Sequence, residues 1–214
     1  MSGGAGEGRR WAEAARHLMR VDGRWRERIR RIGACTLKPN RDRLGVLARA
    51  IVGQQISAQA ARAIEGRLLE RLGGRYEPGA ILGLGIAGLR DVGLSARKAG
   101  YVWGLAEAVA TGRLPLERLG RWKDERIVEA LVAWPGIGRW TAEMFLVFGL
   151  GRPDVWAVDD LGVRAGVQRH YGLERLPKPA ECRELGEAWR PYRSVAMWYF
   201  WREGEAERSA GGAS

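Results

Sequence analysis

Apolar residues recur at spacings of three and four along most of the chain, and alternating runs of β-branched residues are absent. This spacing predicts amphipathic helices, because a strand buried on one face would alternate apolar and polar positions. Helices are expected at 10–20, 24–32, 42–52, 57–72, 96–111, 125–134, 138–149, 159–171, 180–188 and 192–203. The pattern therefore predicts an all-α fold, a bundle of helices with short connections.

Helix ends carry their own signals. Ser57 and Ser95 precede apolar periodic stretches and are expected to cap the helices that follow. The stretch 77–94 contains five glycines, and we expect two short turns there. Residues 1–8 and 204–214 are rich in small and polar residues, and both are expected to be disordered tails.

The net charge of the chain indicates a class of binding partner. The chain has 214 residues, with 36 Lys and Arg against 25 Asp and Glu, a net charge of +11. Such an excess favours a polyanionic partner, most often nucleic acid, although a solvated surface alone would also explain it.

The numbers of cysteines and histidines do not favour a metal or redox site. The two cysteines, Cys35 and Cys182, are too few for a four-cysteine iron–sulfur cluster. We expect both to be buried or half-buried thiols in a reducing cytosol. Two histidines, His17 and His170, do not favour a zinc site. No apolar run has the length of a membrane span, so a cytoplasmic, nucleoid-associated protein is expected.

Ten tryptophans are many for this length. Core packing explains some of them, and we favour a buried face for Trp198. Five, Trp198 among them, stand beside Arg, Gly or Pro in segments that do not read as buried, and could stack on bases: Trp134, Trp140, Trp189, Trp198 and Trp201.

The segment WPGIGRWT, residues 134–141, lies between two predicted helices. Pro135 ends the first helix, and Gly136 and Gly138 let the backbone approach another surface closely. The second helix would then point its N-terminal N–H groups out of the turn, which suits a DNA phosphate. An ordinary tight turn explains the same residues equally well.

Longer motifs favour the DNA reading. They are, in chain order, AIVGQQISAQAA, WPGIGRWTAEMFLVFG, DVWAVDDLGVR and WRPYRSVAMWYFW. Together they resemble the helix-hairpin-helix DNA glycosylase superfamily, and most closely its 3-methyladenine DNA glycosylase II branch, over about residues 40–203.

The resemblance implies two helical lobes with a helix-hairpin-helix and an active-site cleft between them. One lobe would be 43–152, and the other would combine 9–42 with 153–203. The larger bacterial relative has an N-terminal β-domain that is not expected here, where the basic helices at 11–30 would take its place.

Asp159 and Asp160 open the helix that follows the hairpin, and two aspartates at a helix start are ordinary caps. The resemblance implies that Asp160 is the catalytic carboxylate, with Asp159 as the expected cap. Strand-cleaving relatives such as endonuclease III have a nucleophilic lysine where this chain has Trp140, so base release without strand cleavage is expected.

The resemblance also implies the remaining site residues. Trp140, Met144 and Trp201 would line the base pocket. In the loop 54–57 Gln55 would be the wedge that fills the gap left by a flipped nucleotide, although two amides there could simply satisfy helix ends. The residues expected to contact DNA are Gln54, Gln55, Gly136, Gly138, Arg139, Thr141 and Arg193. The carbonyls of Val132, Trp134 and Ile137 would hold a monovalent cation, Na⁺ or K⁺.

The expected function is therefore hydrolysis of the N-glycosidic bond of alkylated purines, of the 3-methyladenine and 7-methylguanine type, in double-stranded DNA. No cofactor is required for this chemistry, and we expect a monomer. Two alternatives remain open: the same fold acting on uracil, hypoxanthine or 8-oxoguanine, or a DNA-binding module without catalysis.

Overall fold

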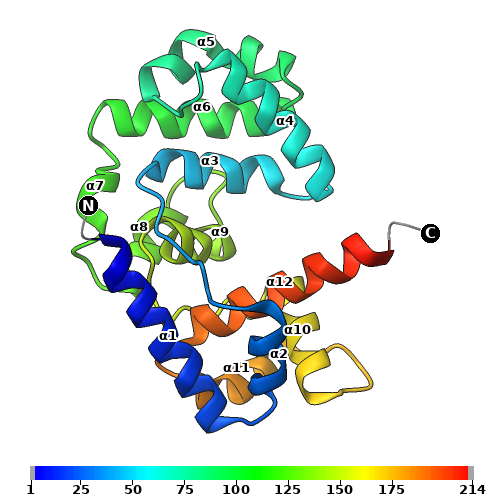
Figure 1. Cartoon of the computed structure of the whole chain (residues 1–214). Helices are drawn as coiled ribbons and strands as arrows, with labels where there is room; N and C mark the ends of the chain where they lie inside the picture. The colour runs from blue at the N-terminus through cyan, green and yellow to red at the C-terminus, as the bar shows by residue number, and fades with distance from the viewer. Residues whose placement is uncertain (1–2, 212–214) are drawn as a thin grey trace. The chain divides into compact units, whose positions relative to one another are not determined.

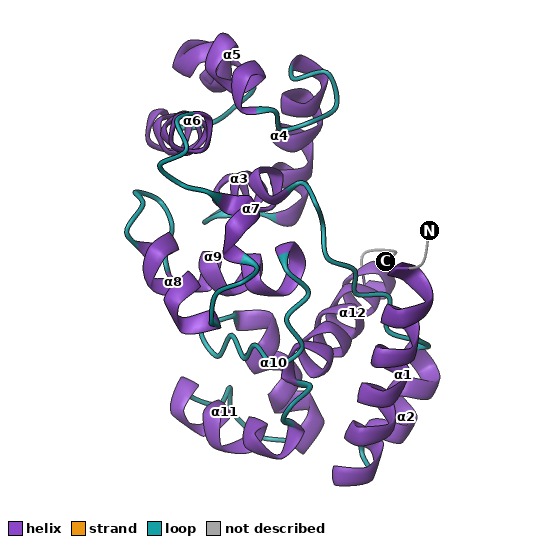
Figure 2. Ribbon diagram, turned by 90° about the vertical axis from the view of Figure 1, so that its left-hand side faces the viewer, coloured by secondary structure: helices purple, strands orange, loops and turns teal. Residues whose placement is uncertain are grey.

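The computed structural model describes residues 3–211, and every regular element in that range is a helix (Figures 1 and 2). The predicted all-α class is confirmed. The chain divides into two compact units: unit 1 joins the chain up to Pro39 with the chain from Gly151 onward, and unit 2 is Asn40–Leu150. The lobes predicted from the sequence, 9–42 with 153–203 and 43–152, have similar limits. No helix in residues 3–211 has the length and hydropathy of a membrane span.

The described part of unit 1 contains five α-helices and a short 3₁₀ turn: α1 (Gly3–Val21), α2 (Trp25–Ile32), α10 (Leu161–Tyr171), α11 (Pro179–Gly186), Glu187–Trp189 and α12 (Arg193–Gly211). Unit 2 contains α3 (Arg43–Gly53), α4 (Ala58–Arg71), α5 (Pro78–Asp91), α6 (Ala96–Ala110), α7 (Leu116–Leu119), α8 (Asp124–Val132) and α9 (Arg139–Met144), which a π-helical turn, Phe145–Gly149, continues.

The helices of unit 2 begin and end largely where local chemistry predicts. The Ser57 hydroxyl accepts a hydrogen bond from the N–H of Ala60 at 3.1 Å, and the Ser95 hydroxyl accepts one from Lys98 at 3.3 Å. Both predicted caps are confirmed. The glycine-rich stretch 77–94 contains the two predicted breaks: α5 is kinked at Gly85, whose φ is 69°, and the chain turns again after Asp91, at Gly93, whose φ is 107°. Both glycines have positive φ, a conformation that a residue without a side chain adopts at little cost.

An aromatic core holds unit 1 together. The Trp25 ring stacks on Phe200 with centroids 5.2 Å apart and meets Trp189 edge-on at 5.3 Å. Trp189 is completely buried, so the prediction that it is accessible for stacking is wrong. Its ring packs against Trp25, Phe200 and His170. The apolar surface of the ring is buried in these contacts, so it is not accessible to a base. Trp198 is buried, as favoured.

Charged groups inside unit 1 are paired. Arg28 donates to Glu203 at 2.9 Å, and both side chains are buried. Arg28 also contacts Nδ1 of His170, whose Nε2 lies 2.9 Å from a carboxylate oxygen of Asp22. Such a network is expected, because an unpaired charge in an apolar interior is strongly destabilising.

The chain ends differ from the prediction of disordered tails. Helix α1 already begins at Gly3, and α12 continues to Gly211, so residues 3–8 and 204–211 are helical. At the C-terminal end, an ion pair joins Arg202 to Glu205 at 3.0 Å, and the Ser209 hydroxyl donates to the Glu205 carbonyl at 3.0 Å. These local bonds extend the helix beyond the apolar pattern that predicts its end. Residues 1–2 and 212–214 of the predicted tails lie outside the described residues.

Candidate functional site

Asp160 is the N-cap of α10 in unit 1. Its Oδ1 accepts a hydrogen bond from the backbone N–H of Val163 at 2.8 Å and another from the indole N–H of Trp201 at 3.0 Å. Asp160 and Trp201 are both half-buried, which keeps the carboxylate reachable from solvent. Two hydrogen bonds to the same oxygen fix the orientation of the group.

The division of roles within the aspartate pair is a correction. Asp159 was the expected cap, but the cap bond to Val163 belongs to Asp160, and Asp159 is exposed. The chain turns just before the pair, where the N–H of Asp160 donates to the Ala157 carbonyl at 3.1 Å. The turn therefore presents Asp160, not Asp159, to the helix start.

Gly162 lies against this carboxylate. A Cβ atom at position 162 would lie 3.1 Å from Oδ1 of Asp160 and 3.1 Å from Cδ1 of Trp201. The absence of a side chain at this position therefore allows the indole to reach the aspartate. Sequence reasoning missed Gly162, because a glycine inside a helix pattern gives no sign of what it packs against.

The predicted hairpin is present in unit 2. Helix α8 ends at Val132, the N–H of Ile137 donates to the Trp134 carbonyl at 3.1 Å, and α9 begins after Gly138. Gly136 has φ of 84°, and a Cβ atom there would lie 2.3 Å from the Tyr101 ring. The position therefore requires glycine both for its backbone conformation and for this close contact.

Gln54 and Gln55 differ in what they do. The Gln54 side chain donates to the Gly136 carbonyl at 2.9 Å and to the Thr141 hydroxyl at 3.3 Å. We therefore correct its predicted role: its amide links a neighbouring loop to the hairpin. Gln55 is exposed and has φ of 57°, the one positive value found for a non-glycine residue within the described chain. An exposed side chain on a backbone in the left-handed conformation fits the predicted wedge.

Two of the predicted DNA contacts do not fit the structure. The Thr141 side chain is 1% exposed and its hydroxyl accepts from Gln54. Arg193 is 9% exposed and is bound to Asp154 at 2.7 Å and to Glu187 at 3.1 Å. We correct both predictions, because buried and internally bonded side chains are not presented to a phosphate. Counting charges along a sequence does not reveal such partners.

Gly138 and Arg139 are both exposed, as residues predicted to contact DNA must be. Gly138 is exposed, and a Cβ atom there would meet nothing within 4 Å. Arg139 is 54% exposed but makes two bonds to Glu125, at 2.9 and 3.2 Å, and one to Glu143 at 3.2 Å. The bonds to Glu125 raise the pKa of Arg139 and lower the pKa of Glu125. A phosphate would have to compete with these carboxylates.

The predicted base-pocket residues fall into both units. In unit 2, Trp140 is half-buried on α9, and Met144, one turn later, is 6% exposed. In unit 1, Trp201 points its indole N–H at Asp160. Its ring face is therefore oriented by the same bond that orients the carboxylate.

The hairpin carbonyls suit a hard cation. Val132 is the last residue of α8, where helix carbonyls lack intrahelical partners. The Trp134 carbonyl accepts one bond, from Ile137, and a carbonyl oxygen has two lone pairs. Oxygen donors of this kind are what alkali cations prefer, so the residues fit the predicted ion.

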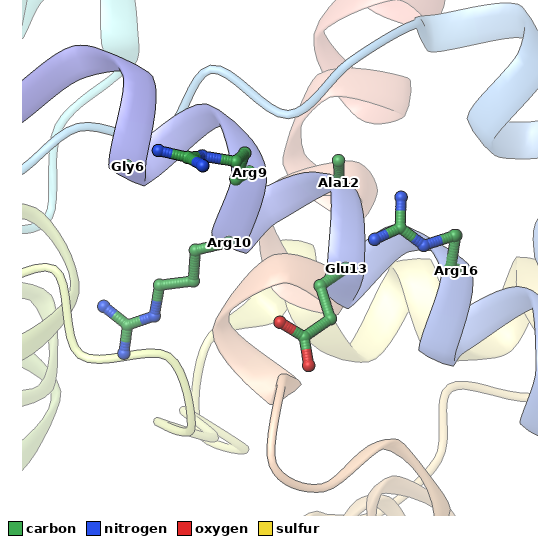
Figure 3. A pocket seen from close by; sticks show the side chains of 6 residues that line it. All are labelled: Gly6, Arg9, Arg10, Ala12, Glu13 and Arg16. Carbon is green, nitrogen blue, oxygen red and sulfur yellow. The ribbon is translucent and has the colours of Figure 1, made fainter.

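Helix α1 carries a separate hollow of about 460 Å³, lined by Gly6, Arg9, Arg10, Ala12, Glu13 and Arg16 (Figure 3). The Arg10 guanidinium lies over the Trp11 ring at 5.0 Å. Because residues of a single helix line it, the hollow is a polar surface feature and not an enclosed pocket for a base.

The cysteines take no part in either cluster. Both are buried and free, and burial raises the pKa of Cys35 to about 11. A thiol with such a pKa is a poor nucleophile at neutral pH. The burial of both cysteines confirms the prediction of buried or half-buried thiols.

Comparison with known proteins identifies the family. Residues 48–191 match the HhH-GPD superfamily of base excision DNA repair proteins. The chain is 34% identical over 194 residues to DNA-3-methyladenine glycosylase 1 of Schizosaccharomyces pombe, covering 87% of this chain and 84% of that protein. It is 31% identical over 163 residues to DNA-3-methyladenine glycosylase 2 of Escherichia coli, covering 72% of this chain and 55% of the relative.

Two solved structures with a similar fold are also 3-methyladenine DNA glycosylases. The fission-yeast 3-methyladenine DNA glycosylase Mag1 in complex with abasic DNA superposes with a TM-score of 0.81 at 33% identity, over 90% of this chain and 97% of that one. A 3-methyladenine DNA glycosylase from Archaeoglobus fulgidus also gives 0.81, at 30% identity, over 92% of this chain and 70% of that chain. The chain therefore belongs to the HhH-GPD superfamily of base excision DNA repair proteins and is a DNA glycosylase, an N-glycosyl hydrolase.

Proposed function

We propose that this glycosylase removes alkylated purines, of the 3-methyladenine and 7-methylguanine type, from double-stranded DNA and leaves the strand intact. The observation that carries the proposal is the Asp160 carboxylate, whose Oδ1 accepts bonds from Val163 and Trp201. The relatives named for 3-methyladenine support the substrate class.

Asp160 supplies the electrostatic part of the reaction. Breaking an N-glycosidic bond builds positive charge on the deoxyribose, and an ionised carboxylate beside C1′ stabilises that charge. The same group orients the attacking water and accepts its proton. The bonds from Trp201 and Val163 hold the carboxylate in one orientation, so little reorganisation is needed in the transition state.

The choice of alkylated purines follows from leaving-group chemistry. Alkylation at N3 or N7 gives the purine a positive charge, so it departs with less help from an acid. The electron-rich faces of Trp140 and Trp201 suit stacking on a cationic base, an interaction of about 0.5–2 kcal/mol. Met144, one turn after Trp140, is 6% exposed, so its side chain packs in the core of unit 2 and its proposed place is behind the Trp140 ring.

Hydrolysis without strand cleavage rests on position 140. A lyase needs an amine that attacks C1′ and forms a Schiff base, and an indole has no such amine. Water activated at Asp160 is then the nucleophile, and the product is an abasic site.

DNA binding is assigned to unit 2 through the hairpin and Gln55. The Gly136–Gly138 turn and the start of α9 are proposed to hold one phosphate, with Gln55 as the wedge. A monovalent cation on the carbonyls of Val132, Trp134 and Ile137 would brace this turn. We further propose that the protein acts as a monomer.

One experiment tests the substrate class and the reaction type. Duplex oligonucleotides with a single 7-methylguanine, hypoxanthine, uracil or 8-oxoguanine are incubated with the protein, and breaks are scored with and without alkali. We expect alkali-dependent breaks at 7-methylguanine. Breaks without alkali would contradict the monofunctional reaction, and release of only the other three bases would contradict the alkylpurine assignment.

A further inference from the structure

The loop Gln54–Ser57, here called the wedge loop, joins α3 to α4 in unit 2. Gln55 has φ of 57° and is exposed, and the next residue, Ile56, is 38% exposed. A left-handed conformation is unfavourable for a residue with a side chain, so the surrounding contacts must hold it.

Lys98 on α6 makes the contacts that hold the main chain of this segment. Its Nζ donates to the Val52 carbonyl at 2.8 Å and to the Gln54 carbonyl at 2.6 Å. These two carbonyls lie on either side of Gly53, where α3 ends. The ammonium therefore fixes the exit of the chain from the helix, directly before Gln55, and it complements the negative end of the helix dipole.

The side chain of Gln54 connects the wedge loop to the hairpin. It bonds the Gly136 carbonyl at 2.9 Å and the Thr141 hydroxyl at 3.3 Å, so the wedge loop and the hairpin are joined directly. Tyr101, one turn after Lys98 on α6, has its ring against Gly136. One helix thus supports both loops, through Lys98 under the wedge loop and Tyr101 under the hairpin.

We propose that Lys98 is a positioning residue for base flipping: it holds the wedge loop in register with the hairpin so that Gln55 occupies the gap left by the extruded nucleotide. The inference rests on the proposed function of this site. It makes Lys98 act through the loop, without contact to the nucleotide or to the reacting atoms. Removing the ammonium lets the loop relax from its left-handed conformation, which lowers the fraction of flipped complex more than the affinity for undamaged DNA.

The test uses Lys98→Met, which keeps the length of the side chain and removes its donors, and Lys98→Arg, which keeps donors and charge. Arg97→Met is the matched control, because Arg97 is the exposed neighbour and loses the same charge. Wedge insertion is read from 2-aminopurine placed beside an abasic-site analogue, a signal that needs no base release. Single-turnover excision and affinity for undamaged duplex are measured in parallel.

We expect Lys98→Met to lower the 2-aminopurine signal and the excision rate at least tenfold, with affinity for undamaged duplex within twofold of the Arg97→Met value. Lys98→Arg should restore most of both. Gln54→Leu removes the bonds to the hairpin and leaves those of Lys98 in place. It should also lower the 2-aminopurine signal and the excision rate. It replaces Lys98→Met in the test if that variant does not fold.

The proposal is overturned if folded Lys98→Met behaves like Arg97→Met, or, where that variant does not fold, if Gln54→Leu behaves like the wild type. Failure of the proposed function looks different. In that case no alkylated base is released by the wild type, whereas the response at the abasic-site analogue still reports whether Lys98 positions the wedge loop.

Discussion

The indole N–H of Trp201 donates a hydrogen bond to Oδ1 of Asp160, with 3.0 Å between the two atoms, although 41 residues separate them in the chain. The bond ties the last helix of unit 1 to the start of α10. It gives Trp201 two separable properties, a donor that orients the carboxylate and an aromatic face.

Trp201→Phe separates these two properties. The variant keeps an aromatic ring and loses the N–H. A hydrogen bond to a charged group contributes about 1.5–3 kcal/mol, so we expect kcat to fall by about 10- to 150-fold. KM should change little, because stacking persists. Steady-state kinetics on alkylated duplex give both values, and a raised KM with unchanged kcat would show that the ring alone matters.

Gly162→Ala tests the packing around the carboxylate. The new Cβ would lie 3.1 Å from both Oδ1 of Asp160 and Cδ1 of Trp201, so one of them must shift by a few tenths of an ångström. We expect kcat to fall by roughly three- to tenfold, since displacement of a positioned group is costly. Gly104→Ala is the control, because a Cβ atom there would meet nothing within 4 Å. Equal rates for the two variants would contradict this role of Gly162.

Gly166→Ala is expected to affect stability instead. Its Cβ would lie 2.3 Å from the Phe200 side chain, where α10 and α12 pack together. Overpacking of this kind costs about 1–3 kcal/mol of the free energy of unfolding. Thermal or urea unfolding measures it, again against Gly104→Ala. A variant as stable as the wild type would mean that the two helices separate without cost.

His170 predicts how stability depends on pH. Burial lowers the pKa of His170 to about 4 from an ordinary 6.5, and the hydrogen bond to Asp22 opposes this shift only in part. Between these two values the unfolded chain binds a proton that the folded chain does not. The free energy of unfolding should therefore fall as the pH falls from 6.5 towards 4, by at most about 3 kcal/mol from this group.

Urea unfolding at several pH values checks this against His170→Gln. The variant lacks the titrating ring, so the part of the slope above pH 5, where most carboxylates are ionised, should flatten. An unchanged slope in His170→Gln would assign the pH dependence to other groups.

Local chemistry predicted the helices well. Ser57 and Ser95 cap where their side chains lie next to the N–H groups they bind, and an apolar period of three to four finds the buried face of α3. The chain ends were misjudged, because glycine content and polarity alone do not show what supports a helix.

The candidate site was predictable only in part. The turn at Gly136 follows from the Pro and Gly residues of the motif, whereas Asp160 and Trp140 were assigned through the resemblance to the glycosylase superfamily. The roles of Trp201, Lys98 and Gly162 depend on contacts between segments distant in the sequence. Arg193 was misjudged for the same reason, because its partner Asp154 lies 39 residues away.

The most direct test of the central claim compares wild type with Asp160→Asn on DNA treated with a methylating agent. The amide oxygen can still accept from Val163 and Trp201, so the fold and the cap should persist, and Asp159→Asn serves as the control. We expect the wild type and Asp159→Asn to release 3-methyladenine and 7-methylguanine. Asp160→Asn should release them at least about 100-fold more slowly with unchanged DNA binding. Release by Asp160→Asn within tenfold of the wild-type rate would contradict the assignment of the carboxylate.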